Sequence, residues 1–96
     1  MLIGCPKEIA TAEKRVALTP DSALQIQKLG FSCVIESGAG DAAGFTDAAY
    51  EQAGVTITKT AANLWTSADV VIKVLPPTPA ETKRLTDGQT LISFFY

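Results

Sequence analysis

Short strand-like runs alternate with helix-like segments along all 96 residues of the chain. The strand-like runs are rich in β-branched or aromatic residues and cover residues 2–5, 31–36, 55–58, 70–74 and 90–95. Several of them are apolar at consecutive positions, which is typical of strands covered on both faces of a parallel sheet. The alternation therefore predicts an α/β fold: a flavodoxin-like or Rossmann-like parallel sheet of about five strands with helices on both faces.

Capping signals predict where the helices begin. Thr19 can cap a helix whose first residue is Pro20, because proline has no N–H group to leave unsatisfied at that position. Phe45 and Tyr50 are spaced as a hydrophobic staple around a second start at Thr46. The predicted helices cover residues 20–29, the segment between Thr46 and Gly54, residues 60–65, and a short segment from the capping box at 78–81 to the turn at 87–88.

The last seven residues, 90–96, are strongly apolar, and no segment follows that could supply a covering helix. An open strand edge of this kind is normally paired or covered. We therefore expect residues 1–96 to be a single domain that is truncated at its last strand and belongs to a longer protein.

Composition excludes several classes of function. The net charge is −2 with both signs scattered along the chain, so no basic stripe for nucleic acid is predicted. No run approaches the roughly 20 apolar residues of a membrane helix. The chain has no His, and its two cysteines, Cys5 and Cys33, lack the spacing of metal sites or disulfide frameworks. Buried packing is expected for both thiols, and no metal site is predicted.

A glycine-rich segment, residues 38–44, follows the second predicted strand and precedes a helix, where a dinucleotide fingerprint could be sought. Its third glycine falls one residue late, and the fingerprint normally occupies the first strand-to-helix turn of its unit. A structural turn that uses the freedom of glycine at positive φ is favoured over a phosphate cradle. No cofactor-binding and no catalytic residue is therefore predicted within the chain.

Two cations are candidate ligands for an anion. Arg15 lies between the first strand and the first helix, near the carboxyl edge of the predicted sheet, where its guanidinium could grip a carboxylate or phosphate. From the residues alone, a solvated loop cation or a partner of Glu13 or Glu8 is favoured over an anion ligand. Lys73 ends an apolar strand at the same edge, where it could pair with an anion or simply extend its ammonium to solvent.

Three segments carry a family resemblance: 14–20 (Lys-Arg-Val-Ala-Leu-Thr-Pro), 36–40 (Glu-Ser-Gly-Ala-Gly), and Lys73-Val74 followed by Pro77. Together they resemble the N-terminal domain shared by alanine dehydrogenase and the NAD(H)-binding subunit of proton-translocating transhydrogenase. The resemblance implies that Arg15 matches the arginine that binds the substrate carboxylate in alanine dehydrogenases. It also implies that the nucleotide fingerprint lies in a separate Rossmann domain further along the chain.

Two departures separate the branches of this family. Alanine dehydrogenases typically carry Lys-Glu-Pro after the Lys-Val pair and a catalytic His near the end of the fifth strand. Here those positions read Leu75-Pro76-Pro77 and Tyr96. Imine chemistry in alanine dehydrogenases needs side chains that move a proton, and a chain without this lysine and this imidazole lacks them. Transhydrogenases need neither residue, because hydride passes directly between two nicotinamides. The resemblance is therefore strongest to the transhydrogenase alpha subunit.

The resemblance implies hydride transfer between NAD(H) and NADP(H), coupled to proton translocation in the full complex. NAD would be bound by the full-length protein and NADP by the partner subunit, while the fragment alone would be inactive and bind neither tightly. Expected partners are the downstream NAD-binding domain, the beta subunit or membrane domain, and a second alpha subunit. The expected location is cytoplasmic, peripheral to the inner membrane. The alternatives are an alanine-dehydrogenase-like oxidoreductase and a stand-alone module that binds an anion or partner through Arg15 and Lys73.

Overall fold

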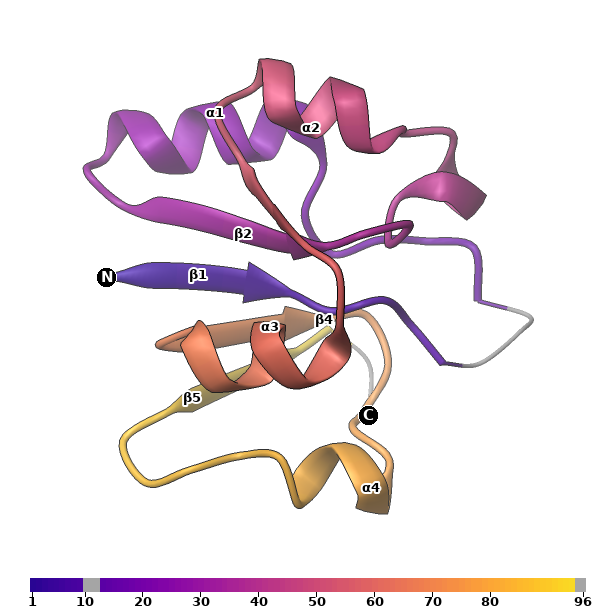
Figure 1. Cartoon of the computed structure of the whole chain (residues 1–96), viewed down its shortest axis with the longest axis vertical. Helices are drawn as coiled ribbons and strands as arrows, with labels where there is room; N and C mark the ends of the chain where they lie inside the picture. The colour runs from indigo at the N-terminus through magenta and orange to yellow at the C-terminus, as the bar shows by residue number, and fades with distance from the viewer. Residues whose placement is uncertain (10–12, 95–96) are drawn as a thin grey trace.

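The computed structural model describes residues 1–9 and 13–94 and shows a parallel sheet with helices on both faces (Figure 1). The predicted α/β class is confirmed. In chain order the elements are β1 (Leu2–Cys5), α1 (Pro20–Lys28), β2 (Ser32–Glu36), the 3-10 helix η1 (Asp41–Ala43), α2 (Asp47–Gln52), β3 (Thr56–Thr58), α3 (Ala61–Ser67), β4 (Val70–Lys73), α4 (Pro79–Thr82) and β5 (Thr90–Ser93).

The strand order is β3-β2-β1-β4-β5, and every neighbouring pair is parallel. In the central pairs, Gly4 of β1 stands opposite Val34 of β2 on one side and Val71 of β4 on the other. Because all strands run the same way, their carboxyl ends meet at a single edge. The loops that follow β1, β2 and β4 are thereby gathered in one place.

Side chains alternate between the two faces of the sheet and build a core on each. In β2, Cys33 and Ile35 join the core beneath α1 and α2, whereas Val34 joins the core beneath α3. The second core is centred on Leu64 and Trp65, which are 0% and 1% exposed. Figure 1 shows α1 and α2 lying together, apart from α3. The two cores explain why the strands are apolar at consecutive positions.

The predicted capping signals are confirmed. The Thr19 side chain accepts a hydrogen bond from the backbone N–H of Ser22, and Pro20 is the first residue of α1. Thr46 caps α2 by accepting from the N–H of Ala49. The staple residues Phe45 and Tyr50 meet edge to face with ring centroids 6.4 Å apart. These local contacts follow from residue type and spacing alone.

Several predicted boundaries differ from the structure. Helix α3 continues two residues beyond Trp65 to Ser67, because the N–H of Ala68 still donates to the Leu64 carbonyl and Ala68 packs in the same core. Helix α4 ends at Thr82 and does not continue to the turn at 87–88. Gln89 explains the early end: its side chain binds the backbone of Thr86 and the carbonyls of Trp65 and Ala68, which holds this segment as a loop against α3.

The strand ends also differ slightly. β2 and β3 begin one residue later than predicted, and β4 ends at Lys73. β5 ends at Ser93, and the predicted last strand residue, 95, lies outside the described residues.

The glycine-rich segment 38–44 forms the predicted turn. Gly38 and Gly44 have φ angles of 82° and 89°, which residues with a side chain rarely adopt. The N–H of Gly38 donates to the Asp47 carboxylate at 2.9 Å, and the Ser37 hydroxyl donates to the same group. The Gly38 N–H, followed by the Ser37 hydroxyl, lowers the pKa of Asp47. The N–H and hydroxyl groups of this turn that could bind an anion therefore bind the carboxylate of Asp47 in the same chain.

Both cysteines are free and buried, on the adjacent strands β1 and β2. Burial raises the pKa of the Cys5 thiol from 9.0 to about 12, and it also raises the pKa of Cys33. We expect neither thiol of the folded chain to react with iodoacetamide at pH 8, because only the thiolate is nucleophilic. Mass spectrometry should show two alkylated cysteines only after unfolding in urea. Rapid alkylation of the native chain would contradict this prediction.

Candidate functional site at the carboxyl edge of the sheet

The sheet has a topological switch point between β1 and β4. The chain builds β2 and β3 on one side of β1 and then crosses over to build β4 and β5 on the other side. In open α/β sheets, ligands bind outside the carboxyl ends of the strands at such a switch point. The segments there are residues 6–9, which follow β1, and residues 74–78, which follow β4. This is the candidate site.

A buried ion pair occupies the switch point. Lys73 is the last residue of β4, and its Nζ donates to Oε1 of Glu8 at 2.7 Å. The two side chains are only 2% and 5% exposed. Glu8 also accepts hydrogen bonds from the N–H groups of Val74 at 3.0 Å and Leu75 at 3.4 Å. One carboxylate therefore joins the loop after β1 to the loop after β4.

A second buried carboxylate approaches the same ammonium. Glu81 of α4 has Oε2 3.6 Å from Lys73 Nζ, and its side chain is 4% exposed. Its other oxygen accepts from the N–H of Thr78 at 2.8 Å, as the second half of the capping box. Helix α4 is thus held at the switch point by a residue that also caps it.

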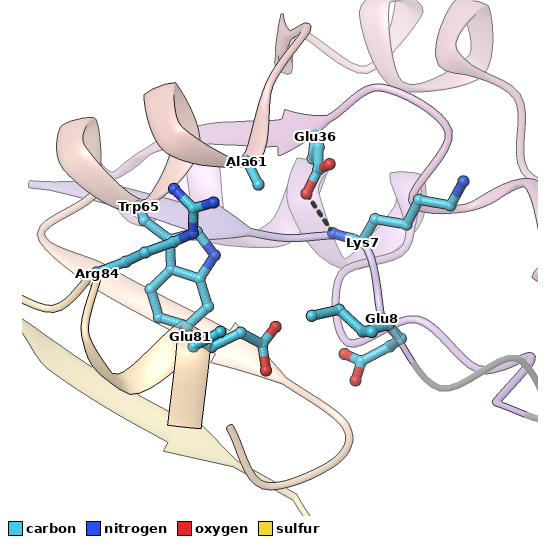
Figure 2. A pocket seen from close by; sticks show the side chains of 9 residues that line it. Lys7, Glu8, Glu36, Ala61, Trp65, Glu81 and Arg84 are labelled. Atoms are coloured by element: carbon cyan, nitrogen blue, oxygen red, sulfur yellow. Dashed lines mark hydrogen bonds between the residues drawn. The ribbon is translucent and has the colours of Figure 1, made fainter. Parts of the chain in front are cut away.

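Two cavities flank this ion pair. Cavity A, of about 280 Å³, lies between the loop after β1, the end of β2, α3 and α4; it is lined by Lys7, Glu8, Ile9, Glu36, Ala61, Trp65, Ala80, Glu81 and Arg84. Figure 2 shows the Glu8 and Glu81 carboxylates facing each other there, while the side chain of Lys7 extends away from them. Cavity A therefore combines an apolar wall with carboxylates.

Cavity B, of about 170 Å³, shares two lining residues with cavity A and is lined by Lys7, Glu8, Glu13, Arg15, Gly38, Ala39, Asp41 and Ala42. The backbone N–H of Lys7 is fixed by Glu36 Oε1 at 2.9 Å. Its Nζ reaches to 3.7 Å from the place that a Cβ on Gly38 would take. Lys7 and Arg15 thus bring two positive charges to the wall of cavity B.

Arg15 is bound on one edge by Glu13. Its Nε donates to Glu13 Oε2 at 2.9 Å, and its Nη2 donates to Oε1 at 2.7 Å. The Arg15 backbone N–H also donates to Oε2 at 2.8 Å. The side-chain hydrogen bonds from Arg15 have the largest effect and, together with the bond from its backbone N–H, lower the pKa of Glu13 from 4.5 to about 2. Of the roles left open for Arg15, the pairing with Glu13 is present in the structure.

The structure brings the two predicted site residues to the same edge but into different surroundings. Arg15 is 57% exposed in its side chain and lines cavity B. Lys73 is enclosed by Glu8 and Glu81, so it does not extend its ammonium to solvent. Sequence reasoning considered Glu8 only as a partner of Arg15 and missed its contact with Lys73 and its place in the lining of both cavities. The signal that could have found it is a carboxylate placed just after a buried strand, at the edge where Lys73 ends.

The chemistry available at this edge is charge recognition. Among residues 1–9 and 13–94, no group of His, Cys, Asp and Glu is arranged to hold a metal ion. Within the same ranges, no helix is long and apolar enough to cross a membrane. The polar groups at the edge are carboxylates, two lysines and two arginines, which bind and orient charged groups.

The family model described as "Alanine dehydrogenase/PNT, N-terminal domain" matches residues 4–96. The chain belongs to this family. The NAD(P) transhydrogenase subunit alpha of Cereibacter sphaeroides is 60% identical over 96 residues, which are 100% of this chain and 18% of that protein. The alanine dehydrogenase of Halomonas elongata is 41% identical over 96 residues, which are 100% of this chain and 26% of that protein.

Experimental structures agree with this assignment. An L-alanine dehydrogenase matches with a TM-score of 0.93 and 40% identity, over 100% of this chain and 26% of that one. A transhydrogenase from Sinorhizobium meliloti matches with a TM-score of 0.90 and 35% identity, over 97% and 27%. The relatives named here are oxidoreductases, and the chain spans about a fifth to a quarter of their lengths.

Proposed function

We propose that this chain is the N-terminal part of the NAD(H)-binding alpha subunit of a proton-translocating NAD(P) transhydrogenase. The observation that carries the proposal is the 60% identity to a transhydrogenase subunit alpha over the whole chain, against 41% to an alanine dehydrogenase. The loop after β4 supports it. Leu75 stands where alanine dehydrogenases typically carry their substrate lysine, and its N–H is bound to Glu8.

In this proposal the chain forms one wall of an interdomain cleft, which is a common place for a ligand site. NAD is bound by a downstream domain of the same protein, and NADP is bound by the partner subunit. The partners are that domain, the beta subunit or membrane domain, and a second alpha subunit. The complex lies at the cytoplasmic face of the inner membrane. The chain by itself holds no nucleotide tightly and transfers no hydride.

We further propose roles for the two predicted site residues. Arg15 binds an anionic group that enters cavity B from the cleft, because its guanidinium lines that cavity and is more than half exposed. Lys73 does not contact the ligand and has a structural role at the cleft. Its ammonium is engaged by Glu8 and Glu81, and through Glu8 it holds the two loops at the switch point.

The second candidate function is an alanine-dehydrogenase-like oxidoreductase. The observation that favours it is the TM-score of 0.93 to an L-alanine dehydrogenase, with 40% identity. The shared scaffold would suit either reaction. The loop with Leu75, Pro76 and Pro77 argues against it, since none of these side chains can hydrogen-bond a substrate.

Enzyme assays on the longer protein that carries this chain decide between the two. We expect hydride transfer from NADH to a chromogenic NADP analogue when its NADP-binding partner is present, and no oxidation of NADH with pyruvate and ammonia. The 96-residue chain should show neither activity. Oxidation of NADH that depends on pyruvate and ammonia would overturn the transhydrogenase proposal, and turnover by the short chain would overturn its role as a scaffold.

A further inference from the structure

The loop between α4 and β5 contains an exposed turn with an aspartate that precedes a glycine, a pair that occurs once in the sequence. Asp87 and Gly88 are the central residues of this turn, and the N–H of Gln89 closes it by donating to the Thr86 carbonyl at 3.3 Å. Since β5 begins at Thr90, the turn lies at the amino edge of the sheet (Figure 1). It is therefore separate from the candidate site, which lies at the carboxyl edge.

Two groups that can react with each other lie side by side in this turn. Among the described residues, the Asp87 carboxylate accepts no hydrogen bond and joins no ion pair, and the Gly88 N–H donates no hydrogen bond. Gly88 has a φ angle of 88°, and a Cβ added to it would meet no atom within 4 Å. The glycine thus places no side chain beside its nitrogen, and its main chain is the most freely rotating of any residue type.

The other aspartates are held in ways that Asp87 is not. Asp47 and Asp69 accept hydrogen bonds from other segments of the chain. Asp21 and Asp41 lie in α1 and η1, where the main chain has a fixed helical conformation. Each of these four is followed by a residue with a side chain. Asp87 therefore differs from all of them both in its neighbour and in its freedom to move.

We propose that Asp87 is a modification site, at which the aspartate converts spontaneously to isoaspartate. The Gly88 nitrogen attacks Cγ of the protonated Asp87 carboxyl group and forms a C–N bond, and the carboxyl hydroxyl leaves with the amide hydrogen as one molecule of water. Water then opens the resulting cyclic imide. Opening at Cγ restores aspartate, whereas opening at the main-chain carbonyl carbon leaves the chain running through Cβ and Cγ, which is isoaspartate. The sequence of steps needs no oxidant, reductant or other reactant.

The conversion changes the contacts of Gln89. Its side-chain amide donates to the carbonyls of Trp65 and Ala68 at the end of α3, and its Oε1 accepts from the N–H of Thr86 at 2.7 Å. These bonds connect the two ends of the turn and bind it to α3, so they require a turn of fixed length. Isoaspartate adds one carbon atom to the main chain between Thr86 and Gln89. The longer turn therefore displaces the Gln89 side chain from its acceptors on α3.

Storage of the 96-residue chain for several weeks in warm neutral buffer tests the proposal, with Asp87→Glu as the matched variant. Protein-isoaspartate methyltransferase and labelled S-adenosylmethionine detect the product, and electron-transfer mass spectrometry of the tryptic peptide 85–96 locates it. We expect isoaspartate to accumulate at Asp87 and the signal to be lost in Asp87→Glu, because glutamate keeps the charge but would have to close a larger ring. Absence of isoaspartate at Asp87, or equal amounts at the other four aspartates, would overturn the proposal.

The side-chain amide of Gln89 gives a second readout by nuclear magnetic resonance. As isoaspartate accumulates, we expect a second pair of Gln89 amide signals, shifted toward those of a solvent-exposed glutamine, in proportion to the converted fraction. A converted chain with unchanged Gln89 signals would overturn the effect on α3. Neither measurement involves a nucleotide or hydride transfer, so this proposal and the proposed function can fail independently.

Discussion

Replacement of Lys73 by Met is expected to lower the free energy of unfolding by about 3–5 kcal/mol, because removing one partner of a buried ion pair leaves an uncompensated charge. The side chains of Lys73, Glu8 and Glu81 are only 2%, 5% and 4% exposed. Methionine fills a similar volume, so the loss is mainly electrostatic. Urea unfolding followed by circular dichroism measures the difference.

Lys7→Met is the matched control for this prediction. Lys7 is exposed on the neighbouring loop, and the same chemical change there should alter the free energy of unfolding by less than about 0.5 kcal/mol. A triple variant that replaces Lys73, Glu8 and Glu81 by Met, Gln and Gln should recover part of the loss, because no charge is then left buried. If Lys73→Met changed the free energy of unfolding as little as Lys7→Met, the ion pair would not contribute to the stability of the fold.

The Lys73 variant also has a consequence for the site. Glu8 holds the N–H groups of Val74 and Leu75 while it binds Lys73. Loss of the ammonium removes the strongest partner of that carboxylate, and the two loops at the switch point lose their common anchor. We therefore expect amide hydrogen exchange of Val74 and Leu75 to accelerate more than that of β3, which forms the far edge of the sheet.

Gly4→Ala is expected to destabilise the chain by about 3 kcal/mol, because β1 has no room for a side chain at this position. A Cβ on Gly4 would lie 2.5 Å from Leu64 Cδ1 and 2.7 Å from Ala68 Cβ, both closer than real Cβ contacts come. Leu64 can move its terminal methyl, but the Ala68 Cβ is fixed to the backbone at the end of α3. Helix α3 must therefore shift away from the central strand. Urea unfolding again gives the change.

The control for Gly4→Ala is a second substitution at the point of contact. Ala68→Gly removes the Cβ that stands 2.7 Å away. In a double-mutant cycle, the pair should be less destabilised than the sum of the single variants by about 1 kcal/mol or more, as expected for residues that touch. Strict additivity would show that the cost of Gly4→Ala arises elsewhere than at the interface with α3.

The helix starts could be predicted from sequence because each depends on neighbours in the chain. Thr19, Thr46 and Thr78 bind N–H groups three residues ahead, so residue type and spacing suffice. The far end of α4 could not be predicted in the same way. It is set by Gln89, whose side chain reaches carbonyls of Trp65 and Ala68 that are 24 and 21 positions away.

The candidate site was predicted only in part. The position of Arg15 and Lys73 at one edge follows from their places after the first and within the fourth strand. The environments of these two side chains do not follow from their places in the chain, because they depend on which carboxylates the fold brings into contact with them. Glu13 is two residues from Arg15 and was among its expected partners. Glu8 and Lys73 are 65 residues apart, and no local pattern joins them.

The sequence by itself determined the α/β class, the number of strands and the helix starts. These are consequences of apolar periodicity and capping, which act over a few residues. Only the tertiary structure decided the strand order β3-β2-β1-β4-β5, and with it the meeting of Glu8, Lys73 and Glu81 at the switch point. The physical reason is burial. An ion pair of this kind is formed only where packing removes water from residues that are distant in the chain, and local sequence does not specify that packing.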